Sequence, residues 1–181
     1  MKVCIFCGAS SSQDPQVEQT ARILMQDFAD RKVELVYGGA AIGVMGTLAN
    51  ELMVKGGRVT GVIPRHLMKK EIAHAGLTEL HVVKDMHERK QLMYKLSDAF
   101  LIFPGGMGTL DELFEILTWR QLGLHAKPIA ILNINNYFDH LLAFLDHAVN
   151  QGLIKSQDRE LLFASSEVDK IWNHFHKDTH G

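Results

Sequence analysis

The residues with the clearest chemical potential are a glycine-rich turn and the carboxylate that follows it. The turn, Pro104–Thr109 (PGGMGT), comes after an apolar run at residues 99–103 and before a helical pattern that contains Glu112. Glycine lets the backbone approach a ligand and adopt positive φ, and a helix start offers free N–H groups with a partial positive charge. This order of strand, turn and helix predicts a phosphate site, with Glu112 in the first helical turn beside the bound group.

Arg89 is the second residue whose position points to function. In a helix over residues 86–96, Leu92, Met93 and Leu96 fall within ~60° of Arg89 around the helix axis. Arg89 therefore lies in the middle of the apolar stripe, where a charge is costly unless it is paired. A snorkelling or ion-paired arginine is the plainer alternative. We favour an arginine that lines a polar pocket and faces a carboxylate or a phosphate.

The helix that carries Glu112 is apolar on two sides. One stripe consists of Leu110, Leu113, Phe114, Leu117 and Gln121. Glu112 lies roughly opposite, on a side that also carries Ile116 and Trp119 and is too apolar to face solvent. A first-turn glutamate that only favours the helix dipole is the common alternative. The apolar side predicts a subunit interface, where loss of water raises the pKa of Glu112 toward that of a general acid.

Strand-like and helical patterns alternate along the chain, which predicts a parallel sheet covered on both faces. The apolar strand-like runs cover residues 2–7, 33–37, 58–63, 79–83, 99–103, 128–132 and, more weakly, 161–164. The helical patterns cover residues 15–31, 43–55, 86–96, 111–122, 137–151 and 168–176. We therefore predict an α/β fold with a parallel sheet of about six or seven strands and helices on both faces, in one domain over residues 1–181.

Three loops of unusual composition follow strand-like runs. They cover residues 8–12 (GASSS), 38–46 (GGAAIGVMG) and 104–109. Ligands of open α/β sheets bind at the carboxyl ends of strands near the switch in strand order, so we expect the loops to meet in one crevice, with Ser10 and Gly39 as candidate contacts. The first loop can instead simply cap the next helix. The second matches neither G-x-G-x-x-G nor a P-loop, and its glycines can serve tight packing.

Composition and charge exclude several classes of protein. The 181 residues are 46% hydrophobic and 22% charged, with a formal net charge of -2, which is typical of a soluble globular protein without a nucleic-acid surface. No apolar run approaches the ~20 residues of a membrane span, and residues 1–7 lack the h-region and cleavage site of a signal peptide. We therefore expect a cytoplasmic protein with no nucleic-acid or membrane partner.

The cysteines and histidines give no metal or redox signal. Cys4 and Cys7 have C-x-x-C spacing but lie in an apolar strand-like run, where residues three apart point to opposite faces. A redox pair would sit at a helix N-terminus, and a zinc site would need two further ligands. The ten histidines include no H-E-x-x-H pair. We predict two buried thiols, no metal and no redox cofactor.

Together these segments resemble the LOG family, the cytokinin riboside 5'-monophosphate phosphoribohydrolases, whose members are also described as lysine decarboxylase-like proteins. Residues 104–112 (PGGMGTLDE) are similar to the family's PGGxGTxxE motif, residues 86–90 (MHERK) to its MxxRK element, and residues 37–46 to its YGGGxxGLMG loop. Further similar segments are FCGASS at 6–11, GVIP at 61–64 and QLGLHAKP at 121–128. The resemblance runs in order from Lys2 to about Asn133, and the combination is far more specific than any one motif.

The resemblance implies a Rossmann-like, doubly wound fold and a homodimer with the site near its interface. It implies hydrolysis of the N-glycosidic bond of nucleoside 5'-monophosphates, AMP or cytokinin riboside 5'-monophosphates, to the free base and ribose 5-phosphate, with no cofactor. Arg89 and Glu112 match the family's catalytic pair. The phosphate turn is matched by Gly105, Gly106, Met107, Gly108 and Thr109. Positions that line the substrate in relatives are matched by Glu71, Lys90, Asp111 and Thr118.

The departures from the family pattern leave the preferred base open. Ala40 replaces a usual glycine, Met107 stands where tyrosine or phenylalanine is common, and Asp111 stands where glutamate is common. Two other functions are alternatives to hydrolysis. A nucleotide or cofactor carrier would use the same loops without turnover. A lysine decarboxylase would need pyridoxal phosphate on a lysine, and no lysine is marked for that role.

Overall fold

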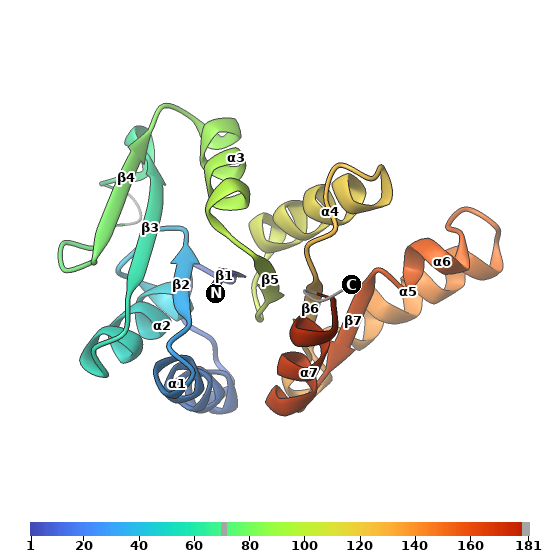
Figure 1. The fold of residues 1–181 in the computed structure, drawn as a ribbon, viewed down its shortest axis with the longest axis horizontal. Helices are drawn as coiled ribbons and strands as arrows, with labels where there is room; N and C mark the ends of the chain where they lie inside the picture. Colours follow the sequence, from blue (N-terminus) through green and yellow to red (C-terminus); the bar gives the residue numbers. More distant parts are fainter. Residues whose placement is uncertain (70–71, 179–181) are drawn as a thin grey trace.

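The sheet of this protein is parallel throughout and doubly wound. The computed structural model describes residues 1–69 and 72–178. Within them, seven strands follow the order β4-β3-β2-β1-β5-β6-β7 (Figure 1). Their bounds are β1 Lys2–Phe6, β2 Glu34–Tyr37, β3 Val59–Pro64, β4 Glu79–Val83, β5 Ala99–Ile102, β6 Ile129–Leu132 and β7 Leu162–Ser165. The chain builds outward from β1 to β4, returns to place β5 on the other side of β1, and ends at β7, which confirms the predicted fold class.

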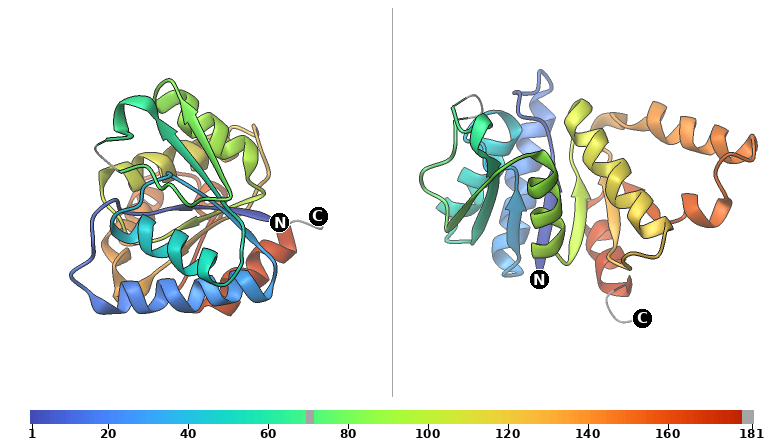
Figure 2. Two further views of the ribbon diagram at one scale, coloured as in Figure 1. Left: turned by 90° about the vertical axis from the view of Figure 1, so that its left-hand side faces the viewer. Right: turned by 90° about the horizontal axis from the view of Figure 1, so that it is seen from above.

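In the described part of the chain, six longer helices cover the two faces of the sheet. One face is packed by α1 (Pro15–Asp30), α2 (Gly43–Val54) and α7 (Val168–Asp178), and the other by α3 (Met86–Leu96), α4 (Met107–Gln121) and α5 (Asp139–Asn150) (Figures 1 and 2). The connections contain the short helices α6 (Ser156–Arg159), η1 (Arg65–Leu67) and η2 (Ile134–Asn136). Parallel strands need such crossovers, and the helices bury both faces of the sheet.

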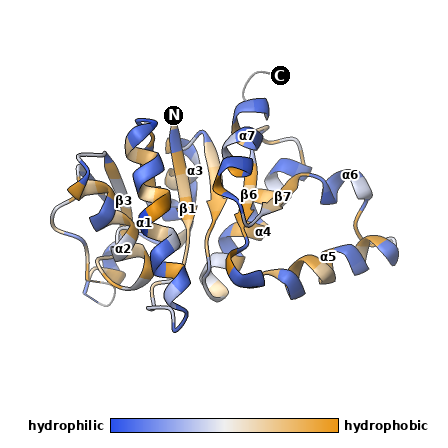
Figure 3. Ribbon diagram, turned by 90° about the horizontal axis from the view of Figure 1, so that it is seen from below, coloured by the Kyte–Doolittle hydropathy of each residue, from blue (hydrophilic) through white to orange (hydrophobic). Residues whose placement is uncertain are grey.

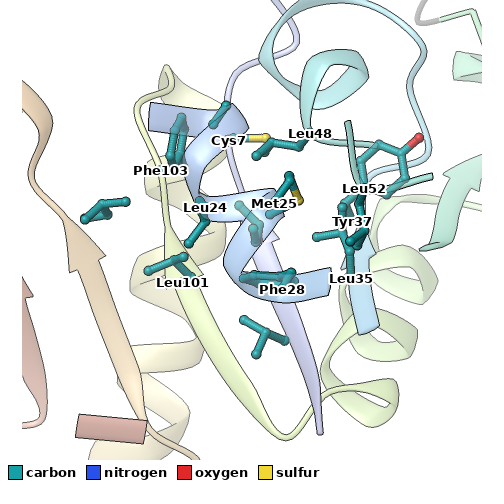
Figure 4. Close-up of a cluster of buried hydrophobic side chains, with 14 of the residues drawn as sticks. Cys7, Leu24, Met25, Phe28, Leu35, Tyr37, Leu48, Leu52, Leu101 and Phe103 are labelled. Carbon is teal, nitrogen blue, oxygen red and sulfur yellow. The ribbon is translucent and has the colours of Figure 1, made fainter. Parts of the chain in front are cut away.

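Helix α1 shows how the sequence builds these layers. The Asp14 side chain caps it by accepting a hydrogen bond from the backbone N–H of Gln16 at 2.9 Å, and Pro15 occupies the first turn. Its buried residues recur at helical spacing: Val17, Ala21, Leu24, Met25 and Phe28. Burying each large side chain contributes about 1.5–3 kcal/mol. These residues meet Leu48 and Leu101 in the core (Figure 4), while the hydropathy colouring places apolar residues on the central strands (Figure 3).

The two cysteines lie on opposite faces of β1 or just beyond its end. Cys4 packs in the core beneath α3, α4 and α5, and Cys7 in the core beneath α1, α2 and α7. Both thiols are free and buried. The alternation of side chains along a strand explains the separation, and the prediction of two buried thiols is confirmed.

The structure corrects two helix boundaries and adds one short helix. Helix α4 begins at Met107, four residues before the predicted start at Asp111, because glycines read as turn signals can still occupy a helix's first turn. Helix α5 begins at Asp139 rather than Tyr137, since η2 occupies the preceding residues. Helix α6, a single turn over Ser156–Arg159, was not predicted.

Candidate functional site

A cavity of about 420 Å³ opens where the strand order switches. The loops that follow the neighbouring strands β1 and β5 form two of its walls, as expected for an open α/β sheet. Its lining consists of Cys7, Gly8, Ala9, Ser10, Ser11, Ser12, Val44, Met45, Leu67, Met86, Arg89, Pro104, Gly105, Gly106, Gly108, Thr109, Asp111, Glu112 and Tyr137. The expected crevice is therefore present, and both Arg89 and Glu112 line it.

Backbone hydrogen bonds join the three predicted loops. The Gly8 N–H donates to the Pro104 carbonyl at 3.1 Å, which ties the first loop to the glycine turn. Two N–H groups in the first turn of α2 donate hydrogen bonds to the same loop. The Val44 N–H donates to the Ser10 carbonyl at 3.4 Å, and the Met45 N–H donates to the Gly8 carbonyl at 3.3 Å. The second glycine loop thus positions the first loop, and it reaches the cavity only through Val44 and Met45.

The glycine turn is packed too closely to accept a side chain at Gly105. A Cβ atom there would lie 2.1 Å from Thr109 Oγ1 and 2.7 Å from the Gly8 nitrogen. Gly106 is the N-cap of α4 and provides no side-chain cap, so the N–H groups of the first helical turn are left for another acceptor. The 15-residue helix adds the partial positive charge of its N-terminus. The turn is suited to bind an anion.

Arg89 is buried, with 3% of its surface exposed, at the cavity end of α3. Asp85 caps this helix by accepting from the Glu88 N–H at 3.0 Å, and that hydrogen bond lowers the pKa of Asp85. The Arg89 guanidinium donates through Nη2 to the Gly38 carbonyl at 3.2 Å. Arg89 and Met93 are the buried residues of α3, so the stripe position predicted for Arg89 is confirmed.

Glu112 is 6% exposed and lies on the buried face of α4. It shares that face with Thr109, Leu113 and Ile116. The predicted stripe is confirmed in part: Leu113 is buried and Leu110 and Leu117 pack against the same core cluster, but Phe114 is exposed. The buried face also includes Glu112 and Ile116, which were predicted to lie on the opposite side. Because α4 starts at Met107, Glu112 lies in the second turn, not the first, and points into the layer between the helix and the sheet.

Both charged residues affect the pKa of Cys7, a cysteine that lines the cavity. Burial raises the pKa of Cys7, the Glu112 carboxylate raises it further, and the Arg89 guanidinium opposes the rise. Cys7, Arg89 and Glu112 all line this cavity, and all three are buried. The site therefore holds a carboxylate and a guanidinium together in a largely desolvated setting, where electrostatic interactions are stronger than in water.

Lys90 bridges α3 and α4 beside this pair. Its Nζ is 3.1 Å from Asp111 Oδ2 and 3.1 Å from Glu115 Oε1, and 12% of its side chain is exposed. Burial alone would lower the pKa of Lys90, but its hydrogen bonds and ion pairs with the two carboxylates outweigh that effect and raise the pKa. Lys90 adjoins Arg89, and Asp111 adjoins Glu112, so this bridge fixes the spacing of the helices that carry them.

The structure places the other predicted site residues in two groups. Those that line the cavity are Ser10, Gly105, Gly106, Gly108, Thr109 and Asp111. Those outside the lining are Gly39, Lys90, Met107 and Thr118. Gly39 packs against Ile63 and Leu80, and Met107 is 87% exposed. Glu71 lies outside the described residues.

Several lining residues were not singled out from the sequence. Ser11 and Ser12 belong to the first loop, which as a whole was expected at the crevice. Met86 lies one helical turn before Arg89, and Tyr137 follows β6. The Tyr137 hydroxyl donates to the Gly105 carbonyl at 2.8 Å. One signal was available for Tyr137: it follows a strand that neighbours β5, and carboxyl-end loops of neighbouring strands gather at one edge of the sheet.

Two further findings concern metals and membranes. Among the residues that the structure describes, no group of three or more histidine, cysteine, aspartate or glutamate side chains is placed to hold a metal ion. Over the same residues, no helix is both long enough and apolar enough to cross a membrane.

A doubly wound sheet whose switch point combines a cavity, a glycine turn suited to bind an anion, a buried arginine and a buried glutamate defines a Rossmann-like protein with a candidate ligand site. Comparison with known proteins agrees. A family model described as possible lysine decarboxylase matches residues 45–175. A cytokinin riboside 5'-monophosphate phosphoribohydrolase from Rhodococcoides fascians is 47% identical over 168 residues, which cover 92% of this chain and 85% of that enzyme. One from Arabidopsis thaliana is 43% identical over 170 residues, which cover 94% and 75%. The chain belongs to this family, the LOG family.

Solved structures share the fold at much lower identity. The molybdenum cofactor binding protein of Rippkaea orientalis has a TM-score of 0.69 and 19% identity, over 95% of this chain and 93% of that one. A molybdenum cofactor carrier protein of Chlamydomonas reinhardtii has a TM-score of 0.71 and 16% identity, over 99% and 98%. These likenesses show the fold alone.

Proposed function

We propose that this protein hydrolyses the N-glycosidic bond of nucleoside 5'-monophosphates, AMP or cytokinin riboside 5'-monophosphates, with Arg89 and Glu112 as its catalytic pair. The bond from C1' to the base nitrogen breaks, water supplies the new C1' oxygen, and the products are the free base and ribose 5-phosphate. The observation that carries the proposal is one cavity that contains an anion-binding turn, a buried guanidinium and a buried carboxylate. Such a protein acts in the cytoplasm.

Glu112 is the residue best suited to act at the anomeric carbon. Cleavage of a glycosidic bond develops positive oxocarbenium character on the ribose. A buried carboxylate stabilises that charge strongly in a site from which water is largely excluded, and it can orient or deprotonate the attacking water. Arg89 donates through Nη2 to the Gly38 carbonyl, and this hydrogen bond holds its guanidinium at the cavity. There the guanidinium can orient Glu112, bind ribose hydroxyls or polarise the departing base.

The phosphate group supplies binding energy remote from the reacting bond. We assign it to the turn Gly105–Thr109, where backbone N–H groups at the start of α4 can donate hydrogen bonds to an anion without a metal. Fixing the phosphate orients C1' toward Glu112 and converts remote binding energy into rate. The serine hydroxyls of the first loop, Ser10, Ser11 and Ser12, line the same cavity and can bind the phosphate or the ribose.

Incubation with AMP tests this function directly. We expect adenine and ribose 5-phosphate in equal amounts. We expect kcat/KM for adenosine to be at least about 100-fold lower than for AMP, because adenosine has no phosphate to contact the turn. Release of both products is followed by chromatography. AMP binding without cleavage would instead indicate a nucleotide carrier, and equal turnover of adenosine would contradict the assigned phosphate turn.

The description of the matching family as possible lysine decarboxylase does not fit the cavity. Such an enzyme would need a lysine in the site to hold pyridoxal phosphate. Among the described residues that line the cavity there is no lysine. Lys90, the lysine beside the catalytic pair, is engaged by Asp111 and Glu115.

A second copy of the chain is the proposed partner, with α4 and α5 in the interface. Large hydrophobic side chains remain exposed along these helices and the segments that follow them: Met107, Phe114, Leu122, Leu124, Phe144 and Leu153. We infer that these side chains form an apolar patch, because contiguous exposed apolar patches mark interaction surfaces. The interface predicted on the Trp119 side is replaced by this one, because Trp119 packs edge-on against Tyr94 of α3, with ring centroids 5.3 Å apart.

Substitution of Phe114 tests this dimer. We expect the protein to elute with about twice the chain mass of 20.3 kDa, and Phe114→Glu to shift it to the monomer because a charge on the interface must be desolvated. The measurement is light scattering after gel filtration. Ile23→Glu, at an exposed isoleucine of α1 on the opposite face of the sheet, is the control and should remain dimeric. A monomeric native protein would contradict the proposed dimer.

A further inference from the structure

The segment between β6 and α5 reaches the phosphate end of the cavity from a distant part of the sequence. Tyr137 lines the cavity, and its hydroxyl donates to the Gly105 carbonyl at 2.8 Å. The rest of the cavity lining comes from residues 7–12, 44–45, 67, 86–89 and 104–112. Tyr137 is therefore the single described lining residue that comes from the part of the chain after α4.

We propose that Tyr137 is a positioning residue that holds the Gly105–Gly106 peptide in the orientation needed to bind the substrate's phosphate. The proposal rests on the function proposed above, in which this turn binds the phosphate. Tyr137 itself need not touch the reacting bond. It acts through the backbone of the glycine turn.

The geometry of the peptide group explains why one hydroxyl has this effect. The Gly105 carbonyl and the Gly106 N–H belong to one planar trans peptide, so they point in opposite directions. A hydroxyl that fixes the carbonyl on one side therefore fixes the N–H on the other. Both flanking residues are glycines, which allow the widest range of φ and ψ, so this peptide is the one in the turn most free to rotate. Without the hydroxyl, the turn would sample orientations that turn its donors away from the anion.

The segment that carries Tyr137 is itself held rigidly. Asn135 and Asn136 adopt left-handed φ of 48° and 59°, a conformation that asparagine tolerates better than most residues. The Asn133 side chain accepts from the Phe138 N–H at 2.8 Å and donates to Asp139 at 2.7 Å. The Asn135 side chain donates to Asp14 Oδ2 at 2.7 Å. These contacts fix the backbone on both sides of Tyr137.

The Tyr137 ring is also supported before any ligand binds. It packs edge-on against Phe138, with ring centroids 4.9 Å apart, and Phe138 is buried. The tyrosine is 54% exposed, so the hydroxyl, and not burial of the ring, accounts for its specific contact with the turn. Replacement by phenylalanine removes this one hydrogen bond and leaves the packing in place.

The test is Tyr137→Phe, assayed with AMP and adenosine and for inhibition by inorganic phosphate. We expect KM for AMP and the inhibition constant of phosphate to rise by the same factor, roughly three- to tenfold, as for loss of one hydrogen bond. We expect kcat for AMP to stay within about twofold, because groups at the reacting bond are unchanged. Any slow turnover of adenosine should be unaffected. A purely structural role would lower both substrates' rates and would not change phosphate inhibition selectively.

Tyr94→Phe is the matched control. Its hydroxyl also donates to a backbone carbonyl, that of Leu124 at 3.5 Å, but Tyr94 lies outside the cavity. If Tyr137→Phe matches the native protein and Tyr94→Phe in all three readouts, the inference about Tyr137 is overturned while the proposed function stands. If the native protein shows no preference for AMP over adenosine and no inhibition by phosphate, the phosphate turn and the role of Tyr137 fail together.

Discussion

Glu112→Gln is expected to lower kcat for AMP by about 10³-fold, the largest effect of any single substitution considered for this protein. Glutamine has almost the same shape, so it fills the buried position on α4 without leaving a void. It lacks the negative charge that stabilises the oxocarbenium-like ribose and cannot accept a proton from water. The loss should appear in kcat and not in KM, because the interaction forms only in the transition state.

The experiment combines steady-state kinetics with AMP titration calorimetry. The variant should bind AMP with an affinity within a few-fold of the native protein, which shows that the phosphate turn is intact. Glu18→Gln is the control, since Glu18 lies in the first turn of α1, the helix that follows the other wall loop, and does not line the cavity. Cleavage by Glu112→Gln at more than about a tenth of the native rate would rule out a catalytic carboxylate at this position.

The sequence predicted the fold and the position of Arg89 because both depend on local periodicity. Continuous apolar runs separated by helical patterns lead to a parallel sheet with helices on both faces. Arg89 falls among apolar residues at about 100° per residue. In the structure it is 3% exposed. Its burial is a property of one helix and could be predicted without knowledge of the neighbours.

The buried face of α4 could not be predicted in the same way. Its leucines and Phe114 suggested one inward stripe. In the structure Leu113 of that stripe is buried together with Thr109 and Ile116, while Phe114 is exposed. Two apolar sides on one helix give the sequence no means to decide which covers the sheet and which remains for a partner. The position of Glu112 depends on that choice. The sequence therefore predicted its loss of water at a subunit interface, whereas the structure buries it within the chain.

Contacts between segments that are distant in the sequence could not be predicted either. Lys90 matched a substrate-lining position of relatives, yet the structure shows it bridging to Asp111 and Glu115 on α4. Tyr137 lies 32 residues after its partner Gly105. No periodicity connects such pairs, because a loop's path is set by turn geometry and by the few hydrogen bonds that fix it. Residues that position a site are therefore harder to predict than residues that resemble catalytic groups.

Gly38→Ala is expected to lower kcat/KM for AMP by about 100-fold although Gly38 does not line the cavity. An added Cβ atom would lie 2.0 Å from Arg89 Nη2, 3.1 Å from Arg89 Cζ and 3.0 Å from Met45 Sδ. The guanidinium is the end of a flexible side chain, so it moves while the backbone stays. The carbonyl that holds Arg89 at 3.2 Å would then no longer fix it beside Glu112.

The signature of this displacement is lost activity with a preserved fold. We expect the melting temperature to fall by only a few degrees, since the clash is relieved by one side chain. We also expect the activities of Gly38→Ala, Arg89→Ala and the double variant to lie within a few-fold of one another, because the two substitutions remove the same interaction. Gly76→Ala is the control: its added Cβ atom would meet only ordinary contacts, the nearest at 3.5 Å. Native activity in Gly38→Ala would show that catalysis does not depend on where Arg89 is held, whereas additive losses in the double variant would show that Gly38 acts through another group.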